Sequence, residues 1–239
     1  MKKKLPDNFT VLIGGEKGGT GKSTIATNMA LMLKLAGYDT HLVDCDKQMS
    51  SLKLSSRRSA NEIKPQLICT HLQGDQLQVP LADLSEKYEA VVIDSGGQDS
   101  VELRSAMISP SVTLLVVPIQ PGFFDVETLM DMNKLVSTSK IYNPNLEARC
   151  LISRASTHYL DTTAEEARVF IQSELNSLKD MKTVIRDRKP FGYSVATGEC
   201  VYEYELRTHA KEKKATSEIC DLFQEITGFK FINSYEGRK

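Results

Sequence analysis

Short apolar runs alternate along this chain with longer segments whose apolar residues recur at helical spacing. The runs are rich in β-branched residues and stop at glycine or polar residues, which is typical of buried strands. We predict strands at residues 9–13, 40–43, 67–69, 90–93, 112–117 and 148–152. Helical spacing is clearest at residues 23–36, which Gly37 terminates, and it recurs at 126–136 and 163–178.

This strand-then-helix rhythm predicts an α/β fold. Right-handed crossovers between successive strands would give a doubly wound, mainly parallel sheet with helices on both faces. Such sheets bind their ligands at the carboxyl ends of the strands. The chain has 239 residues and shows no internal repeat or linker, so we expect residues 1–239 to form a single domain.

A glycine-rich segment joins the first predicted strand to the first predicted helix. A phosphate cradle needs strand, glycine loop and helix N-terminus in this order, because the loop then directs backbone N–H groups at the phosphate oxygens. We expect Lys22 to reach the β- and γ-phosphates of ATP, Ser23 to ligate Mg²⁺ and Thr24 to bond the α-phosphate. The segment reads Glu16-Lys17-Gly18-Gly19-Thr20-Gly21-Lys22-Ser23-Thr24.

The same segment departs from the general phosphate loop at one position, because Glu16 stands where the first glycine is usual. From Lys17 onward it resembles the signature of the ParA/MinD family of deviant Walker A ATPases, and the resemblance extends over nearly the whole chain. The resemblance implies an ATP-sandwich homodimer. In it Lys17 would cross to the partner's nucleotide and stabilise charge on the transferred phosphoryl group. A solvated loop lysine is the alternative.

Carboxylates follow two of the predicted strands. Alternation along the strand places Asp44 and Asp46 on the same side. The family resemblance aligns Asp46 with the aspartate that orients or activates the attacking water, and gives Asp44 a role in supporting the Mg²⁺ shell. Asp94 ends a Walker B strand and is expected to hold Mg²⁺ through water. Helix capping is the alternative for any strand-end aspartate.

Two further segments resemble parts of the family's nucleotide cleft. The segment containing Pro118 resembles the one that lines the cleft. Arg154 ends a strand that resembles the one beside the adenine in small ParA-type, ParF-like partition ATPases. The resemblance implies that Arg154 stacks on the base, with a surface salt bridge as the alternative.

Net charge limits how the protein can attract nucleic acid. The formal net charge is −1, so any attraction to DNA must be local. The densest basic cluster begins in residues 183–188, which resemble the C-terminal signature of the partition ATPases. We expect sequence-independent, salt-sensitive DNA contacts there, with an ordinary solvated face as the alternative. The expected contacts are Arg186, Arg188, Arg207, Lys211, Lys213 and Lys214.

These expectations favour a switch for DNA partition in the cytoplasm, associated with the nucleoid in the ATP state. ATP would build the dimer, the dimer would bind double-stranded DNA non-specifically, and a ParB-like centromere-binding or adaptor protein would stimulate slow hydrolysis. The same cycle could instead position a protein complex, a division regulator or membrane-associated cargo.

The alternatives of other classes are weaker. The last helical pattern has acidic residues opposite its apolar face, which favours core packing over a MinD-like lipid contact. No apolar run approaches the ~18 residues of a membrane span, so we expect no stable membrane insertion. The five cysteines show no metal-ligand spacing, which argues against a metal-cluster ATPase.

Overall fold

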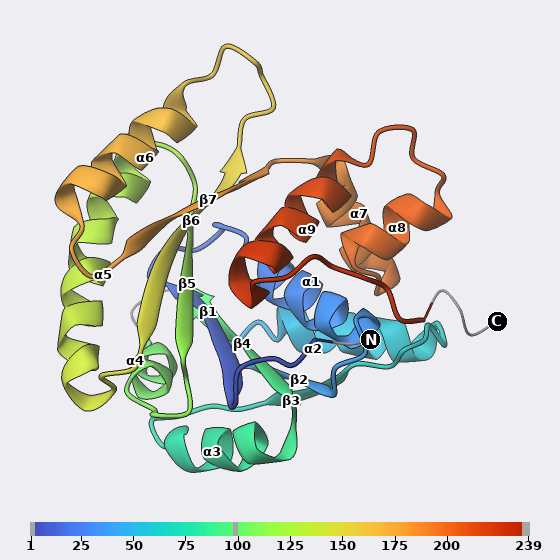
Figure 1. Ribbon diagram of the computed structural model, residues 1–239, viewed down its shortest axis with the longest axis horizontal. Helices are drawn as coiled ribbons and strands as arrows, with labels where there is room; N and C mark the ends of the chain where they lie inside the picture. The colour runs from blue at the N-terminus through green and yellow to red at the C-terminus, as the bar shows by residue number, and fades with distance from the viewer. Residues whose placement is uncertain (1–2, 98–99, 236–239) are drawn as a thin grey trace.

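The computed structural model describes residues 3–97 and 100–235, and within them seven strands form one sheet. Every neighbouring pair is parallel. The order across the sheet is β3-β2-β4-β1-β5-β6-β7, so the chain winds outward in both directions from its centre (Figure 1). The strands are β1 (Phe9–Gly15), β2 (Thr40–Asp44), β3 (Ile68–His71), β4 (Ala90–Gly97), β5 (Leu114–Ile119), β6 (Glu147–Ala155) and β7 (Lys179–Arg186).

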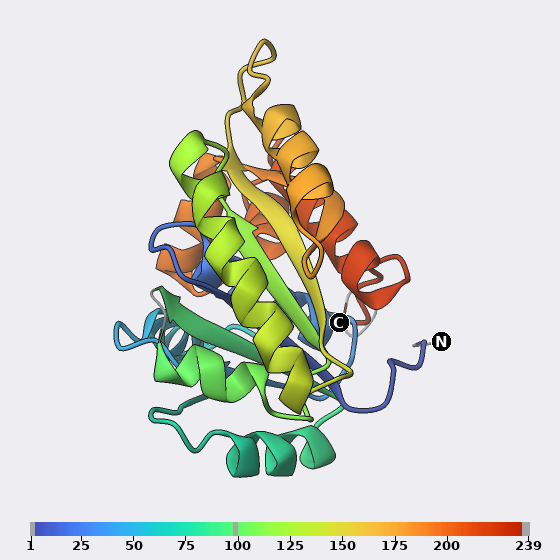
Figure 2. The same cartoon turned by 90° about the vertical axis from the view of Figure 1, so that its left-hand side faces the viewer.

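Helices cover both faces of this sheet, each over its own apolar core. One face carries α1 (Lys22–Leu35), α2 (Ser50–Ala60), α7 (Lys189–Thr197), α8 (Val201–Arg207) and α9 (Lys214–Thr227). The other face, turned to the viewer in Figure 2, carries α3 (Gln78–Lys87), α4 (Val101–Met107), α5 (Phe123–Tyr142) and α6 (Thr163–Glu174). The predicted doubly wound parallel fold is therefore confirmed.

The structure adds one strand that the apolar pattern did not predict. β7 lies at the edge of the sheet, and its buried residues Met181, Thr183 and Ile185 alternate with more exposed ones. A half-exposed edge strand gives no continuous apolar run, which explains the omission. The predicted helix at 163–178 is correspondingly too long: α6 ends at Glu174, and the chain then turns into β7.

Acidic residues of α9 accept hydrogen bonds from backbone N–H groups along the open edge of β7. The Glu225 carboxylate accepts hydrogen bonds from the backbone N–H groups of Lys182 and Thr183, at 2.7 and 2.9 Å. Glu218 accepts from the N–H of Arg186 at 3.0 Å. The apolar face of α9 is buried, as predicted, and its acids protect a sheet edge that would otherwise be free to pair with another chain.

Within the described part of the chain, no helix has both the length and the apolar character needed to cross a membrane.

Candidate nucleotide site

The phosphate loop borders a cavity of about 430 Å³ at the carboxyl ends of the strands. Gly19 and Gly21 have φ angles of 78° and 92°, which side chains rarely adopt, so these positions require glycine. Gly21 is also the N-cap of α1 and supplies no side-chain cap, which leaves first-turn N–H groups available for an anion. All loop residues from Gly18 to Thr24 except Thr20 line the cavity.

Lys22 is the buried cation of this cavity. It is 6% exposed, and its Nζ donates to the carbonyl oxygen of Lys17. Burial lowers the pKa of the Lys22 ammonium, while Asp94 and Asp46 act in the opposite direction. An ammonium has three donors, so this group is suited to bind phosphate oxygens that enter the cavity. Lys17 itself is exposed.

Asp94 lies within β4, paired with Asp44 at the end of β2, and is fully buried. Its Oδ2 accepts from the hydroxyl of Ser51 at 2.6 Å, whereas its Oδ1 meets no donor among the described residues. Burial raises the pKa of Asp94 to about 7, against the hydrogen bonds from Ser51 and Ser23. The Oδ1 of Asp94 is buried and accepts no hydrogen bond within the described part of the chain, and the hydroxyl of Ser23 lies near the same carboxylate. This combination fits a hydrated Mg²⁺ ion.

Asp44 and Asp46 have different surroundings. β2 ends at Asp44, so the alternation argument does not extend to Asp46. Asp44 is buried, and its two carboxylate oxygens accept from the N–H groups of Asp46 and Leu52 at 2.9 and 2.8 Å. Asp46 borders the cavity, and its Oδ1 accepts from the N–H of Gln48 at 2.9 Å. Asp44 thus shapes the loop that presents Asp46.

Ser51 belongs to the site although it was not among the predicted residues. It lies in the first turn of α2 and fixes one oxygen of Asp94. Gln48 and Ser50 also line the cavity. The signal that could have identified them is the presence of Gln48, Ser50 and Ser51, which carry amide or hydroxyl groups, shortly after Asp46.

Arg154 lines the cavity from the carboxyl end of β6. Its Nη1 donates to the carbonyl oxygen of Gly19 at 2.8 Å, and its Nε lies 3.6 Å from the Asp187 carboxylate. The guanidinium therefore lies over the phosphate loop, and base stacking stays a prediction. The structure places Pro118 elsewhere: it lies on β5 and lines a separate cavity of about 20 Å³ with Glu16, Lys17 and Thr20.

The residues expected to bind DNA differ in their exposure and in their ion-pair partners. Arg186 and Arg188 line the nucleotide cavity, and both pair with Glu218, at 3.7 and 2.7 Å. β7 ends at Arg186 and Arg188 precedes α7, so both lie at the cavity wall, and their contact with DNA stays a prediction. Arg207 pairs with Glu199 and Lys214 with Glu212, while Lys211 and Lys213 are exposed.

Gly97 closes the cavity against the phosphate loop. A Cβ added there would lie 2.8 Å from Cα of Gly18 and 3.0 Å from Nζ of Lys22, whereas a Cβ on Gly96 meets nothing closer than 3.7 Å. We expect Gly97→Ala to weaken nucleotide affinity about tenfold, because overpacking of this kind costs about 1–3 kcal/mol. Gly96→Ala is the matched control and should bind normally. Equal affinities of the two variants in calorimetry would contradict this interpretation.

Comparison with known proteins agrees with this geometry. Residues 11–198 match the model of the CobQ/CobB/MinD/ParA nucleotide binding domain. The chain belongs to this family. It is therefore a nucleotide-binding member of the ParA/MinD ATPases, and the family resemblance seen in the sequence is confirmed. The match includes the phosphate loop, Asp46 and Asp94.

Individual relatives have low sequence identity to this chain but align with most of its length. The maintenance of carboxysome distribution protein A of Halothiobacillus neapolitanus is 22% identical over 223 residues, which are 91% of this chain and 96% of the relative. The ATP complex of a Cyanothece McdA variant superposes with a TM-score of 0.71 at 14% identity, over 94% of this chain and 98% of the other. A putative plasmid partition protein from Borrelia burgdorferi bound to AMPPNP has a TM-score of 0.59 at 17% identity, over 84% and 97%. At these identities the structures show a shared fold.

Proposed function

We propose that this protein is an ATP-dependent, dimerising switch ATPase that partitions DNA. It binds duplex DNA without sequence preference in the ATP state and releases it when a ParB-like partner stimulates hydrolysis. The observation that carries the proposal is the cavity in which the buried ammonium of Lys22, the hydroxyl of Ser23 and the carboxylate of Asp46 converge. The basic residues at 211–214 supply a surface for phosphates.

The residues of the cavity have separate roles in this proposal. Lys22 and the loop N–H groups bind the phosphates. Ser23 and Asp94 hold Mg²⁺, which neutralises phosphate charge when bound. Asp46 orients the attacking water, because its carboxylate borders the cavity without being buried like Asp44. The exposed Lys17 reaches a nucleotide held by a second copy of the chain.

A second candidate function has the same ATPase cycle but carries a protein cargo. The relative named for carboxysome distribution favours it, since that protein matches this chain along 96% of its own length. The two functions differ in one property, which is binding of the ATP state to bare DNA.

The test compares ATP, ADP and no nucleotide in two measurements on the same protein. Sedimentation should show a dimer with ATP and a monomer otherwise. Fluorescence anisotropy with a labelled duplex of arbitrary sequence should show binding with ATP alone. Equal DNA binding with ADP and with ATP would refute the switch. An ATP-dependent dimer that does not bind DNA would favour the function with a protein cargo.

A further inference from the structure

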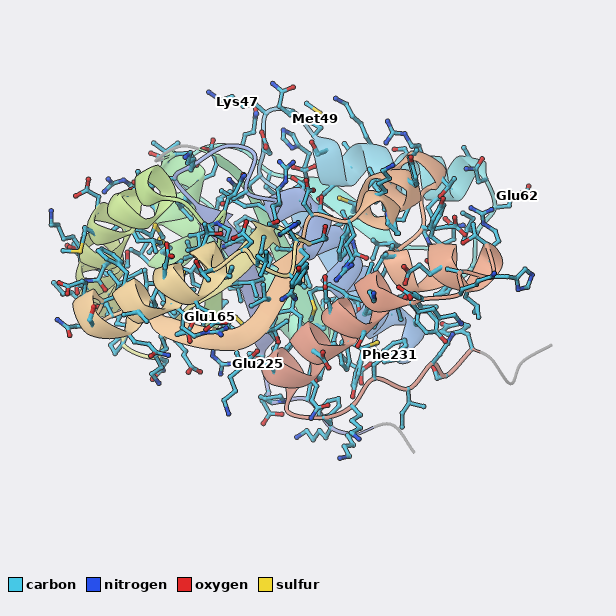
Figure 3. The ribbon with its side chains drawn as sticks, turned by 90° about the horizontal axis from the view of Figure 1, so that it is seen from above. Lys47, Met49, Glu62, Glu165, Glu225 and Phe231 are labelled. Atoms are coloured by element: carbon cyan, nitrogen blue, oxygen red, sulfur yellow. The ribbon has the colours of Figure 1, made fainter. Side chains whose placement is uncertain are left out.

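The segment that follows Asp46 has an unusual charge pattern. Residues 47–61 contain four cations and no acidic residue, in a chain whose formal net charge is −1. The four are Lys47, Lys53, Arg57 and Arg58, and the last three belong to α2. Figure 3 shows this helix along an outer edge of the molecule, between the labelled Met49 and Glu62. A long-range attraction for polyanions can therefore arise here although the whole protein is nearly neutral.

Among the residues that the structure describes, no carboxylate pairs with Lys53 or Arg57 of α2. Lys53 and Arg57 are exposed, and they donate to the carbonyl oxygens of Gln48 and Val195, at 2.7 and 3.4 Å. Arg58 differs, because its buried guanidinium forms an ion pair with Glu203 at 2.7 Å. Lys53 and Arg57 thus differ from the basic residues expected to bind DNA, of which four pair with a carboxylate: Arg186, Arg188, Arg207 and Lys214.

The exposed face of α2 also has the chemistry of a phosphate contact. Ser56 is exposed on the same face as Lys53, three residues away, and its hydroxyl donates to the carbonyl oxygen of Leu52 at 3.0 Å. Serine hydroxyls commonly contact phosphate oxygens. The apolar residue Leu54 is buried in the core. α2 is described in full, and no large apolar side chain is exposed along it. A lipid surface would need such side chains to bury, so a nucleic-acid backbone fits this face better.

We propose that the exposed face of α2, carried by Lys53 and Arg57, binds the phosphate backbone of duplex DNA. This inference rests on the proposed function, in which the ATP state binds DNA, and it assigns the surface that does so. The residues at 211–214 then add to the contact without being its centre.

The position of α2 links this surface to the nucleotide. Ser51 in its first turn donates to Asp94, and the N–H of Leu52 donates to Asp44. Ser50 lines the cavity. Hydrogen bonds therefore join the first turn of the DNA-binding helix to two buried carboxylates, Asp94 in β4 and Asp44 at the end of β2.

The far end of α2 is anchored to the C-terminal helices. Arg58 Nη1 donates to the carbonyl oxygen of Gly198 at 3.1 Å as well as to Glu203. Gly198 has a φ of 82°, and a Cβ there would lie 2.5 Å from the backbone nitrogen of Arg58. Gly198 and Arg58 thus join the C-terminal end of α2 closely to α7 and α8.

The experiment measures duplex binding by the full chain with a non-hydrolysable ATP analogue across a salt series. For Lys53→Ala/Arg57→Ala we expect at least tenfold weaker binding at low salt. The slope of log affinity against log salt should fall by about 0.9 for each lost contact, which is about 1.8 for each protomer of the dimer that contacts the duplex. The control Lys134→Ala/Lys140→Ala removes two lysines from α5, on the opposite face of the sheet, and should bind like the wild type. ATP-dependent dimerisation of each variant reports that the protein is folded.

The outcomes separate the inference from the proposed function. If the wild-type dimer binds no DNA, both fail. If the wild type binds and the α2 variant has the same slope and affinity, the inference alone is overturned. Binding of phosphatidylserine vesicles that depends on Lys53 and Arg57, with DNA binding unchanged, would also overturn it in favour of a membrane. Recovery of DNA binding by Lys53→Arg/Arg57→Lys, which keeps both charges, would support it.

Discussion

Replacement of Lys22 by alanine is expected to lower the affinity for ATP by about 100-fold or more. The ammonium is buried beside the phosphate loop, where burial already lowers the pKa of this group. Two charge-assisted hydrogen bonds to phosphate oxygens at about 1.5–3 kcal/mol each would account for a loss of at least this size. Calorimetry with ATP and with ADP, both in the presence of Mg²⁺, measures it.

Lys17→Ala is the matched control, because Lys17 lies in the same loop but is exposed. It should keep the nucleotide affinity of the monomer and lose the ATP-dependent dimer, since its proposed target lies in the other subunit. A Lys22→Ala variant that binds ATP as well as Lys17→Ala does would show that the buried lysine is structural. Thermal unfolding without nucleotide should change little in either variant, because Lys17 is exposed and burial disfavours the charge of Lys22.

The fold could be predicted because most of its strands are buried on both faces. β1, β4 and β5 are covered by helices on each side, so nearly all of their residues are apolar and buried. β7 escaped prediction because it lies at the edge and its polar residues alternate with apolar ones. Its N–H groups find carboxylates on α9, and such a long-range pairing leaves no local pattern in the sequence.

The candidate site was predictable where it depends on consecutive residues. The phosphate loop is one segment between a strand and a helix, so its place in the fold followed from the order of elements. Arg186 and Arg188 were assigned to a DNA surface from the local charge, and the sequence could not show that both also line the cavity. The structure places both beside the nucleotide cavity and opposite Glu218, which is 30 residues or more further along the chain.

The same limit applies to the carboxylates. Strand alternation suggested equivalent positions for Asp44 and Asp46, and the sequence could not show that β2 stops between them. Ser51 was missed because no helix was predicted directly after the second strand and no local pattern marks its partner. Its partner Asp94 lies 43 residues away in the chain, and the two meet only because β2 and β4 are neighbours in the sheet.

Replacement of Asp46 by alanine is expected to lower the rate of ATP hydrolysis by about 100-fold or more, the usual contribution of a positioned acid–base group. ATP binding should be kept, because Lys22 and the loop N–H groups that bind phosphate are unchanged. The variant should therefore accumulate as an ATP-bound dimer. Single-turnover hydrolysis and sedimentation with ATP measure the two effects on the same sample.

Asp46→Asn distinguishes the chemical role of this side chain from a structural one. Asparagine keeps an oxygen that can accept from the N–H of Gln48, the hydrogen bond that Asp46 makes at 2.9 Å, but it lacks the negative charge. If the carboxylate orients or activates water, Asn and Ala should be equally slow and equally dimeric. If Asn restores the wild-type rate, Asp46 only shapes the loop before α2. A variant that is monomeric with ATP would show instead that Asp46 helps to build the dimer, and its role in hydrolysis would have to be abandoned.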